Sequence, residues 1–320
     1  MVTAIGDATV TAIARHYIMP EVTDIVYNSN PLMFRLNAGK KIIPGGTQLE
    51  FPLMVSRFSA GGPYSGYDVL AMTPSDTIKN GVWDWKQHYI PVVVDGRTLI
   101  KVDSPLAIAN IIRMQFEQAQ MELAQNLGVG IYSDGTTNPK EIDGLQNAVA
   151  ASGTYAGLAR ASNTGINAQV DSSTATLSLT ALNSLHGNTR KGGRAASLIA
   201  SRQEQYNRYW KLAIDKANIF LEPVTRDASM ADLGWGGLLF NGVPWIVDDN
   251  MFDGPNTSNS GILMLNEDYI HFAVSPRADF YLEDFQTPLN QDAMAAKLLW
   301  AGNLIVRNPA RQGKMTNVSA

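Results

Sequence analysis

The side chains of this chain best suited to acid–base or metal chemistry are its histidines, which lie far apart in the sequence. None of them has a second histidine or a carboxylate at the spacing that a zinc site needs. The 320 residues include no cysteine, which excludes disulfides, thiolate nucleophiles and cysteine-ligated metals and is compatible with a reducing cytoplasm. We therefore expect packing or surface roles for the four histidines, which are His16, His88, His186 and His271.

A cluster of carboxylates is the best candidate for binding a cation. Asp248, Asp249 and Asn250 are followed closely by Asp253 and Gly254, and oxygen ligands that alternate in a loop suit calcium. The cluster lacks the loop with a terminal bidentate glutamate that defines an EF-hand, so we expect a solvated turn at a strand end. A carboxylate pair for glycoside hydrolysis stays open, because the separation of such a pair depends on the fold. The sequence singles out no pair.

Nucleotide and nucleic-acid sites are only weakly indicated. Gly128-Val129-Gly130 lacks the third glycine of a dinucleotide fingerprint, and the sequence has neither a P-loop nor a nucleophile elbow. The densest basic run, Thr189 to Arg194, could contact DNA or acidic residues of a neighbouring chain, although a solvated loop is the simpler interpretation. The net charge of −4 gives no sign of a nucleic-acid groove. We expect no catalytic residue, no metal and no cofactor, and hence no enzyme.

The elements that position side chains are more informative, and the first is a long β-hairpin. Thr47 to Arg57 alternates apolar and polar residues as a strand with one buried face does, and Pro52 marks it as an edge or bulged strand. A glycine-rich tip, Ser59 to Tyr67, separates it from a return arm, Thr77 to Val94. Arms of roughly 15 residues would reach about 50 Å, and a two-stranded ribbon of that length needs something else to pack on.

Two tryptophans, Trp83 and Trp85, lie in the return arm. Alternation along a strand places both on one face. Such a pair could stack on a sugar or a base, but burial of that face against another subunit explains the pair better.

One long helix follows the hairpin. Asp103-Ser104-Pro105 provides an N-cap candidate with proline in the first turn, and Gly128 ends the run as a C-cap residue does. The helix would span roughly 35 Å. Its apolar residues recur at spacings of three and four and form one stripe, which consists of Ile108, Ile112, Phe116, Ala119, Leu123 and Leu127.

An N-terminal arm precedes the hairpin, and a further domain follows the helix. Val10 to Met19 predicts a helical turn or two before Pro20, without a core of its own. Beyond a boundary near residue 134 the pattern alternates as in an α+β or α/β domain, and Asn241-Gly242 is the strongest hairpin signal. The predicted elements of this domain are helices at 178–189 and 202–217 and strands at 195–200, 238–240, 244–247 and 262–265.

The final segment predicts two long strands, at 278–285 and 296–306, and then a polar tail. The sequence shows no secretion signal and no apolar run of the roughly 20 residues that a membrane span needs. We therefore expect neither export by a recognisable signal nor insertion in a membrane.

This order of hairpin, helix, inserted domain and final strands resembles the major capsid proteins of tailed bacteriophages, which have the Hong Kong 97-type fold. The resemblance covers nearly the whole chain, and three local matches support it. Asp134-Gly135-Thr136 with Asp143-Gly144-Leu145 is similar to the family's entrance to its axial domain. Asn241 to Val247 is similar to a late strand pair of that domain, and Leu298 to Ala310 to the closing strand of the peripheral domain.

The resemblance implies an α+β fold in four parts. These are an N-terminal arm (1–44), an extended loop (45–95), a peripheral domain with the long spine helix (96–133 and 272–320) and an axial domain (134–271). The loop would lie across a neighbouring subunit, and axial domains would meet around five-fold and six-fold axes. We expect contacts between subunits at Phe58, Tyr64, Tyr67, Lys79, Trp83, Trp85, Arg190, Lys191 and Arg194.

The resemblance also implies a function and partners. The chain would be a structural subunit that self-assembles through pentamers and hexamers into an icosahedral phage head, around double-stranded DNA held without sequence-specific binding. It would assemble in the host cytoplasm and end in the virion, without membrane contact. A portal and a decoration protein are further expected partners.

The chain departs from the family's archetype in two ways. It has no room for the archetype's N-terminal scaffolding segment, which implies a separate scaffolding protein or assembly without one. Lys79 and Lys86 lie in the loop, but the archetype's cross-linking trio does not match residue by residue. The alternatives are the shell of a cellular nanocompartment with the same fold and, less favoured, a carboxylate-dependent enzyme.

Overall fold

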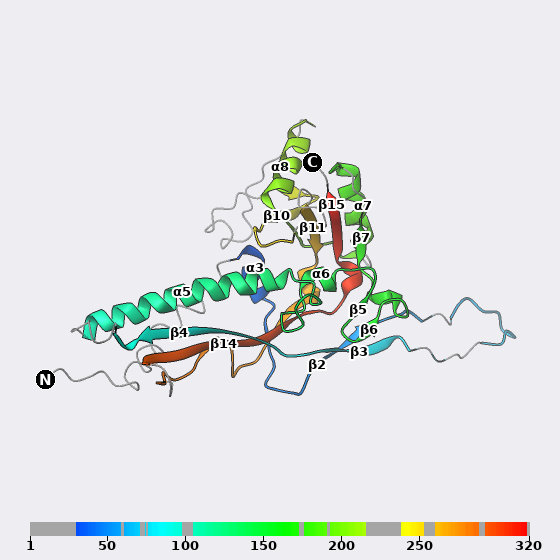
Figure 1. The fold of residues 1–320 in the computed structure, drawn as a ribbon. Coiled ribbons are helices and arrows are strands. Elements are labelled where there is room, and N and C mark those ends of the chain that lie inside the picture. The colour runs from blue at the N-terminus through cyan, green and yellow to red at the C-terminus, as the bar shows by residue number, and fades with distance from the viewer. Residues whose placement is uncertain are drawn as a thin grey trace. The chain divides into compact units, whose positions relative to one another are not determined.

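A computed structural model of the chain describes residues 30–58, 61–70, 74, 76–97, 105–172, 176–190, 193–215, 238–252, 260–287 and 292–318. Figure 1 shows its helices and strands. The chain divides into two compact units, each built from three separate stretches of sequence. The first unit contains Met1–Gly46, Trp85–Gly144 and Phe272–Leu304, and the second contains Thr47–Asp84, Leu145–His271 and Ile305–Ala320.

The first unit is a β-sheet with a long helix. The strands run in the order β1-β12-β14-β13, and β4 also pairs with β14. Most of β12 and β14 belongs to this unit. Its elements are α3 (Pro31–Asn37), β1 (Lys41–Ile42), β4 (Lys86–Asp95), α5 (Pro105–Ile131), β12 (Ile270–Val274), β13 (Tyr281–Leu282) and β14 (Ala293–Val306).

The longest ladder of this sheet joins β4 to β14, antiparallel from Asp95 opposite Ala293 to Lys86 opposite Gly302. Alternate residues of β4, namely Ile90, Val92 and Val94, are buried. Figure 1 shows α5 running alongside β4. The helix therefore covers the face of the sheet that these residues supply.

The stripe predicted for the long helix is confirmed where its side chains are described, because Ile112, Phe116 and Leu123 are buried. The predicted end at Gly128 is wrong, since the helix continues to Ile131. A Cβ added at Gly130 would lie 3.4 Å from Ile142 Cδ1, an ordinary van der Waals contact, so Ile142 covers this last turn of the helix. The predicted N-cap lies outside the described residues.

A tight turn follows α5. The carboxylate of Asp134 accepts hydrogen bonds from the backbone N–H groups of Thr136 and Thr137, each at 3.0 Å, and from both hydroxyls. The backbone N–H groups of Thr137 and Thr136 lower the pKa of Asp134 to about 2, because they stabilise the charged form. This segment, Asp134-Gly135-Thr136, is one of the local matches on which the resemblance is based, and the structure shows a turn there.

The second unit is built on a six-stranded sheet in the order β7-β15-β11-β8-β10-β9. Two short hairpins, β2 with β3 and β5 with β6, belong to the same unit. Its elements are β2 (Leu49–Met54), β3 (Ile78–Trp83), α6 (Leu145–Ala148), β5 (Thr154–Tyr155), β6 (Leu158–Ala159), η2 (Thr164–Ile166), β7 (Gln169–Asp171), α7 (Leu179–Thr189), β8 (Leu198–Ser201), α8 (Gln203–Asp215), β9 (Leu239–Phe240), β10 (Val243–Val247), β11 (Ser260–Leu265), η4 (Glu267–Tyr269), η5 (Pro309–Arg311) and β15 (Gly313–Val318).

One hydrophobic core joins this sheet to α7 and α8. Leu182 of α7 and Tyr209 of α8 belong to the same buried cluster as Trp245 of β10. The rings of Tyr209 and Trp245 stack with centroids 4.6 Å apart. The predicted hairpin is confirmed: Asn241 and Gly242 both have positive φ and connect β9 to β10, as a type I′ turn requires.

The structure of the C-terminal segment differs from the one that the sequence predicted. A polar tail was expected, and residues 272–320 were assigned to the peripheral domain. Instead β15 lies between β7 and β11 in the sheet of the second unit, with Met315 and Val318 buried. The predicted strand at 278–285 is also shorter, because only β13 within it pairs, with residues 298–299 of β14.

Two buried cations complete the short helix α6. Arg160 donates to the carbonyl oxygens of Asn147 and Ala148 at 2.8 and 2.9 Å, and Lys314 donates to that of Gln146 at 3.0 Å. Burial, with Arg160 nearby, lowers the pKa of Lys314 to about 8. The last carbonyls of a helix lack hydrogen-bond partners within the helix. In α6, Arg160 and Lys314 are the donors to these carbonyls.

Candidate functional site

The β2–β3 hairpin is the described part of the predicted ribbon. Leu49 pairs with Trp83 at one end and Met54 with Ile78 at the other. Each strand has six residues, so the regular ribbon spans roughly 20 Å, less than the predicted length. The predicted alternation is confirmed, because Leu49 and Leu53 are buried and Met54 is exposed.

Trp83 holds the root of this ribbon. Its side chain is only 2% exposed and lies edge-on to Phe51 and Tyr155, with ring centroids 6.2 and 5.7 Å away. Backbone N–H of Val82 also donates to the carbonyl of Ala156. Trp83 is covered by its own chain and is not available to a neighbouring one, which corrects the expectation for this residue.

The two tryptophans do not share a strand face. β3 ends at Trp83 and β4 begins at Lys86, so the return arm changes its partner strand from β2 to β14 between them. Trp85 is half-buried, and its Nε1 donates to the carbonyl of Gly46 at 2.9 Å. Alternation had predicted one continuous strand here.

The loop that joins β2 to β3 exposes apolar and aromatic side chains. Phe58, Tyr64 and Tyr67, which the sequence predicted to contact another subunit, are all exposed. The contact itself stays a prediction. Ser65 and Asp68 close a turn that contains Tyr67. The backbone N–H of Ser65 donates to the carboxylate of Asp68, and the backbone N–H of Asp68 donates to the carbonyl of Ser65. Sequence reasoning missed further exposed apolar side chains of the ribbon, which are Met54, Val69, Leu70 and Ile78.

The predicted basic contacts are separate from this loop. Lys79 is exposed on β3. Arg190 is exposed beyond the end of α7, and Arg194 forms an exposed ion pair with Asp268. Lys191 lies outside the described residues. Whether any of these residues contacts another subunit stays a prediction.

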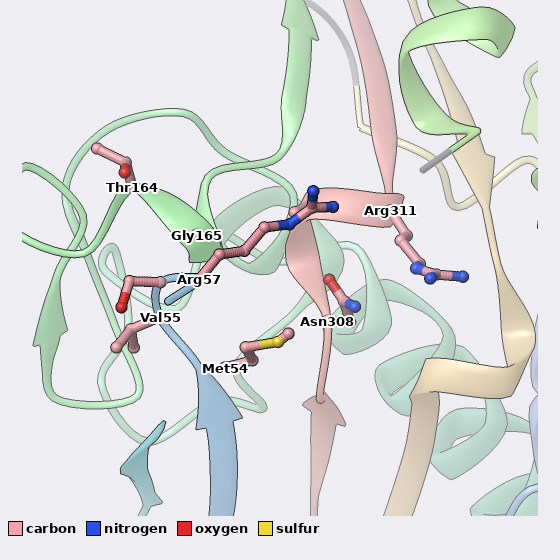
Figure 2. Close-up of a pocket in the computed structure, with 9 residues that line it drawn as sticks. Met54, Val55, Arg57, Thr164, Gly165, Asn308 and Arg311 are labelled. Carbon is pink, nitrogen blue, oxygen red and sulfur yellow. The ribbon is translucent and has the colours of Figure 1, made fainter. Parts of the chain in front are cut away.

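A pocket of about 530 Å³ lies beside the end of β2 in the second unit. In Figure 2 the side chain of Arg57 reaches across it above the amide of Asn308, and Arg311 points away from Arg57. The Arg311 guanidinium lies 5.0 Å from the centre of the Tyr269 ring. Gly165 donates to the carbonyl of Val55 at 2.9 Å and closes one wall.

This pocket offers hydrogen-bond donors and no acid–base pair. The residues that line it are Met54, Val55, Ser56, Arg57, Thr164, Gly165, Asn308, Ala310 and Arg311. A general acid or base requires a side chain that titrates near the working pH, and guanidinium groups do not. The pocket therefore supports binding more readily than catalysis.

The residues first considered for chemistry lie apart. His186 packs edge-on to Phe240 and burial lowers its pKa; burial also lowers the pKa of His88, which lies against Trp300. His271 is part of β12, and His16 lies outside the described residues. In the described part of the chain, no group of three or more histidine or acidic residues could hold a metal ion.

The predicted turn at Asp248 is confirmed, but the side chain of Asp248 is not exposed to solvent as expected. Asp248 is buried, and its carboxylate accepts from the backbone N–H of Asn250 at 3.0 Å. Its own N–H donates to the carbonyl of Ser201. The carboxylate therefore shapes the backbone after β10, and the rest of the cluster, Asp253 and Gly254, lies outside the described residues.

The described helices include none that is both long and apolar enough to cross a membrane. Neither the protein-family models nor the curated protein sequences match the chain. Solved structures do. The capsid asymmetric unit of cyanophage A-1(L) is 14% identical and matches with a TM-score of 0.62, over 91% of this chain and 93% of that chain.

Two other shells are similar. The capsid of an empty GTA particle is 12% identical, with a TM-score of 0.57 over 89% of this chain and 96% of that chain. The SrpI encapsulin from Synechococcus elongatus PCC 7942 is 14% identical, with a TM-score of 0.52 over 77% of each chain. At these identities the likeness shows the fold: the chain is a mixed α+β protein with the fold of phage capsid proteins.

Proposed function

We propose that this protein is the major capsid subunit of a tailed bacteriophage, with the Hong Kong 97-type architecture, and that it assembles into an icosahedral head around double-stranded DNA. The observation that carries the proposal is the ribbon of the second unit. It presents Tyr64, Tyr67 and Val69 to solvent on a two-stranded hairpin, in a chain whose fold matches capsid subunits.

Apolar side chains exposed to water are unfavourable until another surface covers them. Contiguous apolar surface is rare on monomeric proteins and marks contact sites. A two-stranded hairpin is also marginal on its own, and Trp83 fixes only its root. The ribbon loop therefore gains most when another copy of the chain covers it.

Assembly then follows from many weak contacts. Each subunit would strap a neighbour with its ribbon and be strapped by another, and such contacts combine by multivalency once the lattice begins to close. The loop contacts would come from Phe58, Tyr64 and Tyr67, with Lys79, Arg190, Lys191 and Arg194 as polar contacts. Trp85 would position the start of β4, where its Nε1 bonds to Gly46.

The finer assignments belong to the same proposal. The N-terminal arm, the extended loop and the peripheral and axial domains keep the predicted order, with residues 305–320 moved to the axial domain because β15 pairs with β7 and β11. Pentamers and hexamers, a separate scaffolding protein, a portal and a decoration protein would complete the head. The protein would act without a catalytic residue or cofactor, in the virion, after assembly in the host cytoplasm.

Negative-stain electron microscopy of the purified protein, alone and with candidate scaffolding proteins, tests the proposal. Shells, tubes or ring-shaped capsomers are the expected particles. A single small oligomer under every condition of salt, concentration and scaffold would contradict it.

A nanocompartment shell is the second candidate, because the SrpI encapsulin shares the fold over 77% of each chain. The two functions differ in what the shell encloses. Nuclease-resistant DNA inside particles from the native source supports the phage head, whereas a co-purifying enzyme cargo without DNA supports the nanocompartment.

A further inference from the structure

The pocket beside the end of β2 carries positive charge without a negative charge to balance it. Arg57 and Arg311 are among the nine residues that line the pocket, and none of the nine is acidic. Every lining residue belongs to the second unit. The whole chain has a net charge of −4, so the positive charge is a local property of this pocket and does not reflect the composition of the chain.

The polar side chains of the pocket lack acceptors within the protein. In the described part of the chain, neither the guanidinium of Arg57 nor the side-chain amide of Asn308 has a hydrogen bond or an ion pair. The guanidinium of Arg311 lies on the ring of Tyr269, and its buried Nη1 has no hydrogen-bond partner among the described residues. Both arginine charges are therefore available to attract an anion.

The donors are arranged so that one group entering from solvent can meet two of them. Figure 2 shows the side chain of Arg57 extending across the pocket above the amide of Asn308. Arg57 and Thr164 are exposed, whereas Asn308 and Arg311 are half-buried. An acceptor that enters past the exposed guanidinium therefore reaches the amide beneath it.

Contacts within the second unit hold the walls of the pocket in place. The backbone N–H of Gly165 donates to the carbonyl of Val55 at 2.9 Å, and a Cβ added at Gly165 would clash with that carbonyl. The ring of Tyr269 fixes the direction of Arg311, with the guanidinium 5.0 Å from the ring centre. Because the walls are formed before a ligand arrives, binding costs less conformational entropy.

The lining favours a carboxylate on an apolar stem. Arginine binds carboxylates and phosphates through paired hydrogen bonds. Met54, Val55 and Ala310 also line the pocket, and apolar walls suit the methylene groups of a glutamate better than the sugar and phosphate groups of a nucleic acid. The negative net charge of the chain also opposes the approach of a nucleic acid. The volume of about 530 Å³ lies within the range of pockets that bind small ligands.

We propose that this pocket binds a glutamate side chain of an acidic peptide. The carboxylate accepts hydrogen bonds from the guanidinium of Arg57 and the amide of Asn308, and the methylene groups pack against Met54. Arg311 contributes a second positive charge. The pocket is formed within one unassembled chain, so the proposal does not depend on the proposed capsid function and can fail or succeed separately from it.

Fluorescence anisotropy of a labelled octaglutamate peptide tests the site on the full-length, unassembled protein at low salt. Arg57→Gln removes the charge of an exposed side chain, and Asn308→Asp places a negative charge in the pocket without changing the size of the side chain. Each variant should weaken binding by about fivefold or more.

The matched control is Arg277→Gln, which removes an exposed arginine of the first unit and should change the affinity by less than about twofold. The thermal midpoint of each variant, measured by circular dichroism, verifies that it is folded. Because Arg57 is exposed, its substitution should leave the fold intact even if Asn308→Asp does not. Wild-type protein that does not bind octaglutamate, or equal losses for Arg57→Gln and Arg277→Gln, would overturn the proposal.

A competition experiment separates a carboxylate ligand from a phosphate ligand. Unlabelled octaglutamate and a single-stranded DNA of similar charge each displace the labelled peptide from wild-type protein. Octaglutamate should compete at a concentration lower by about fivefold or more. A DNA that competes as well as octaglutamate would contradict the assignment of an acidic peptide.

Modification of arginine by phenylglyoxal locates the site independently. Mass spectrometry of the full-length protein compares the modification rates of Arg57 and Arg277, which are both exposed. Octaglutamate should slow the modification of Arg57 by about threefold or more and leave the rate at Arg277 unchanged, because a bound carboxylate covers the first guanidinium only. An unchanged rate at Arg57, or equal protection of both arginines, would show that the peptide does not bind in this pocket.

Discussion

The ring of Trp83 meets the ring of Tyr155 edge-on, with centroids 5.7 Å apart and planes at 77°. Tyr155 continues the connection, because its hydroxyl accepts from the backbone N–H of Val306 at 2.9 Å. The root of the ribbon is therefore anchored through a tyrosine to the end of β14, inside the second unit.

Replacing Trp83 by alanine should destabilise the second unit by about 3 to 5 kcal/mol, because the substitution leaves a large cavity beside Phe51 and Tyr155. Urea unfolding of the unassembled subunit, followed by circular dichroism, measures the loss. The matched control is Trp85→Ala, which removes a half-buried side chain and should cost less than half as much. Equal losses for the two variants would remove the special role of Trp83.

The exposed loop should matter for assembly and not for folding. The variant Tyr64→Ser/Tyr67→Ser/Val69→Ser removes apolar surface that has no partner within the described chain. Its thermal midpoint should stay within about 2 °C of the wild type, since exposed substitutions cost little. Sedimentation should show loss of large particles, and Ser65→Ala should assemble normally. Wild-type assembly of the triple variant would show that these side chains make no contact that matters.

The hairpin turn offers a test of backbone strain. Gly242 has φ of +79° and no atom within 4 Å of an added Cβ, so Gly242→Ala should lower the unfolding free energy by about 1 kcal/mol through backbone conformation alone. Asn241→Gly, at the neighbouring position with φ of 51°, should be neutral or stabilising. A neutral Gly242→Ala would contradict the type I′ assignment.

Lys314 should make stability depend on pH above neutrality. Burial lowers its pKa in the folded chain from the ordinary 10.5 to about 8. Between these values the unfolded chain binds more protons, so the contribution of Lys314 to stability rises with pH, by at most about 1.4 kcal/mol per pH unit.

The comparison with Lys314→Met isolates this effect, because methionine keeps the apolar stem and cannot titrate. The unfolding free energy of the wild type minus that of the variant should increase from pH 8 to pH 10. A difference that stays constant or falls over that range would show that Lys314 keeps its ordinary pKa.

Local chemistry made several elements predictable. The N-cap of α7 is Ser178, whose side chain accepts from the N–H of Ala181 at 3.1 Å, and the sequence had started that helix there. Asn241-Gly242 tolerates positive φ, and the apolar stripe of α5 follows the helical period. In each case the signal and the structure lie within a few residues of one another.

Elements that depend on distant partners were missed. The sequence of β15 is polar, yet Lys314 is buried. Its amine donates to the carbonyl of Gln146 and lies 5.9 Å from the centre of the Phe252 ring, and neither residue is near it in the sequence. The change of partner strand between Trp83 and Trp85 leaves no mark on an alternating pattern.

The most direct test of the central claim, that the ribbon straps one subunit to another, is electron microscopy and sedimentation of a chain that lacks residues 59–76, beside the full chain under identical conditions. The account predicts a folded subunit, with the wild-type thermal midpoint within a few degrees, that forms few or no shells. Shells of normal number and size from the shortened chain would contradict it.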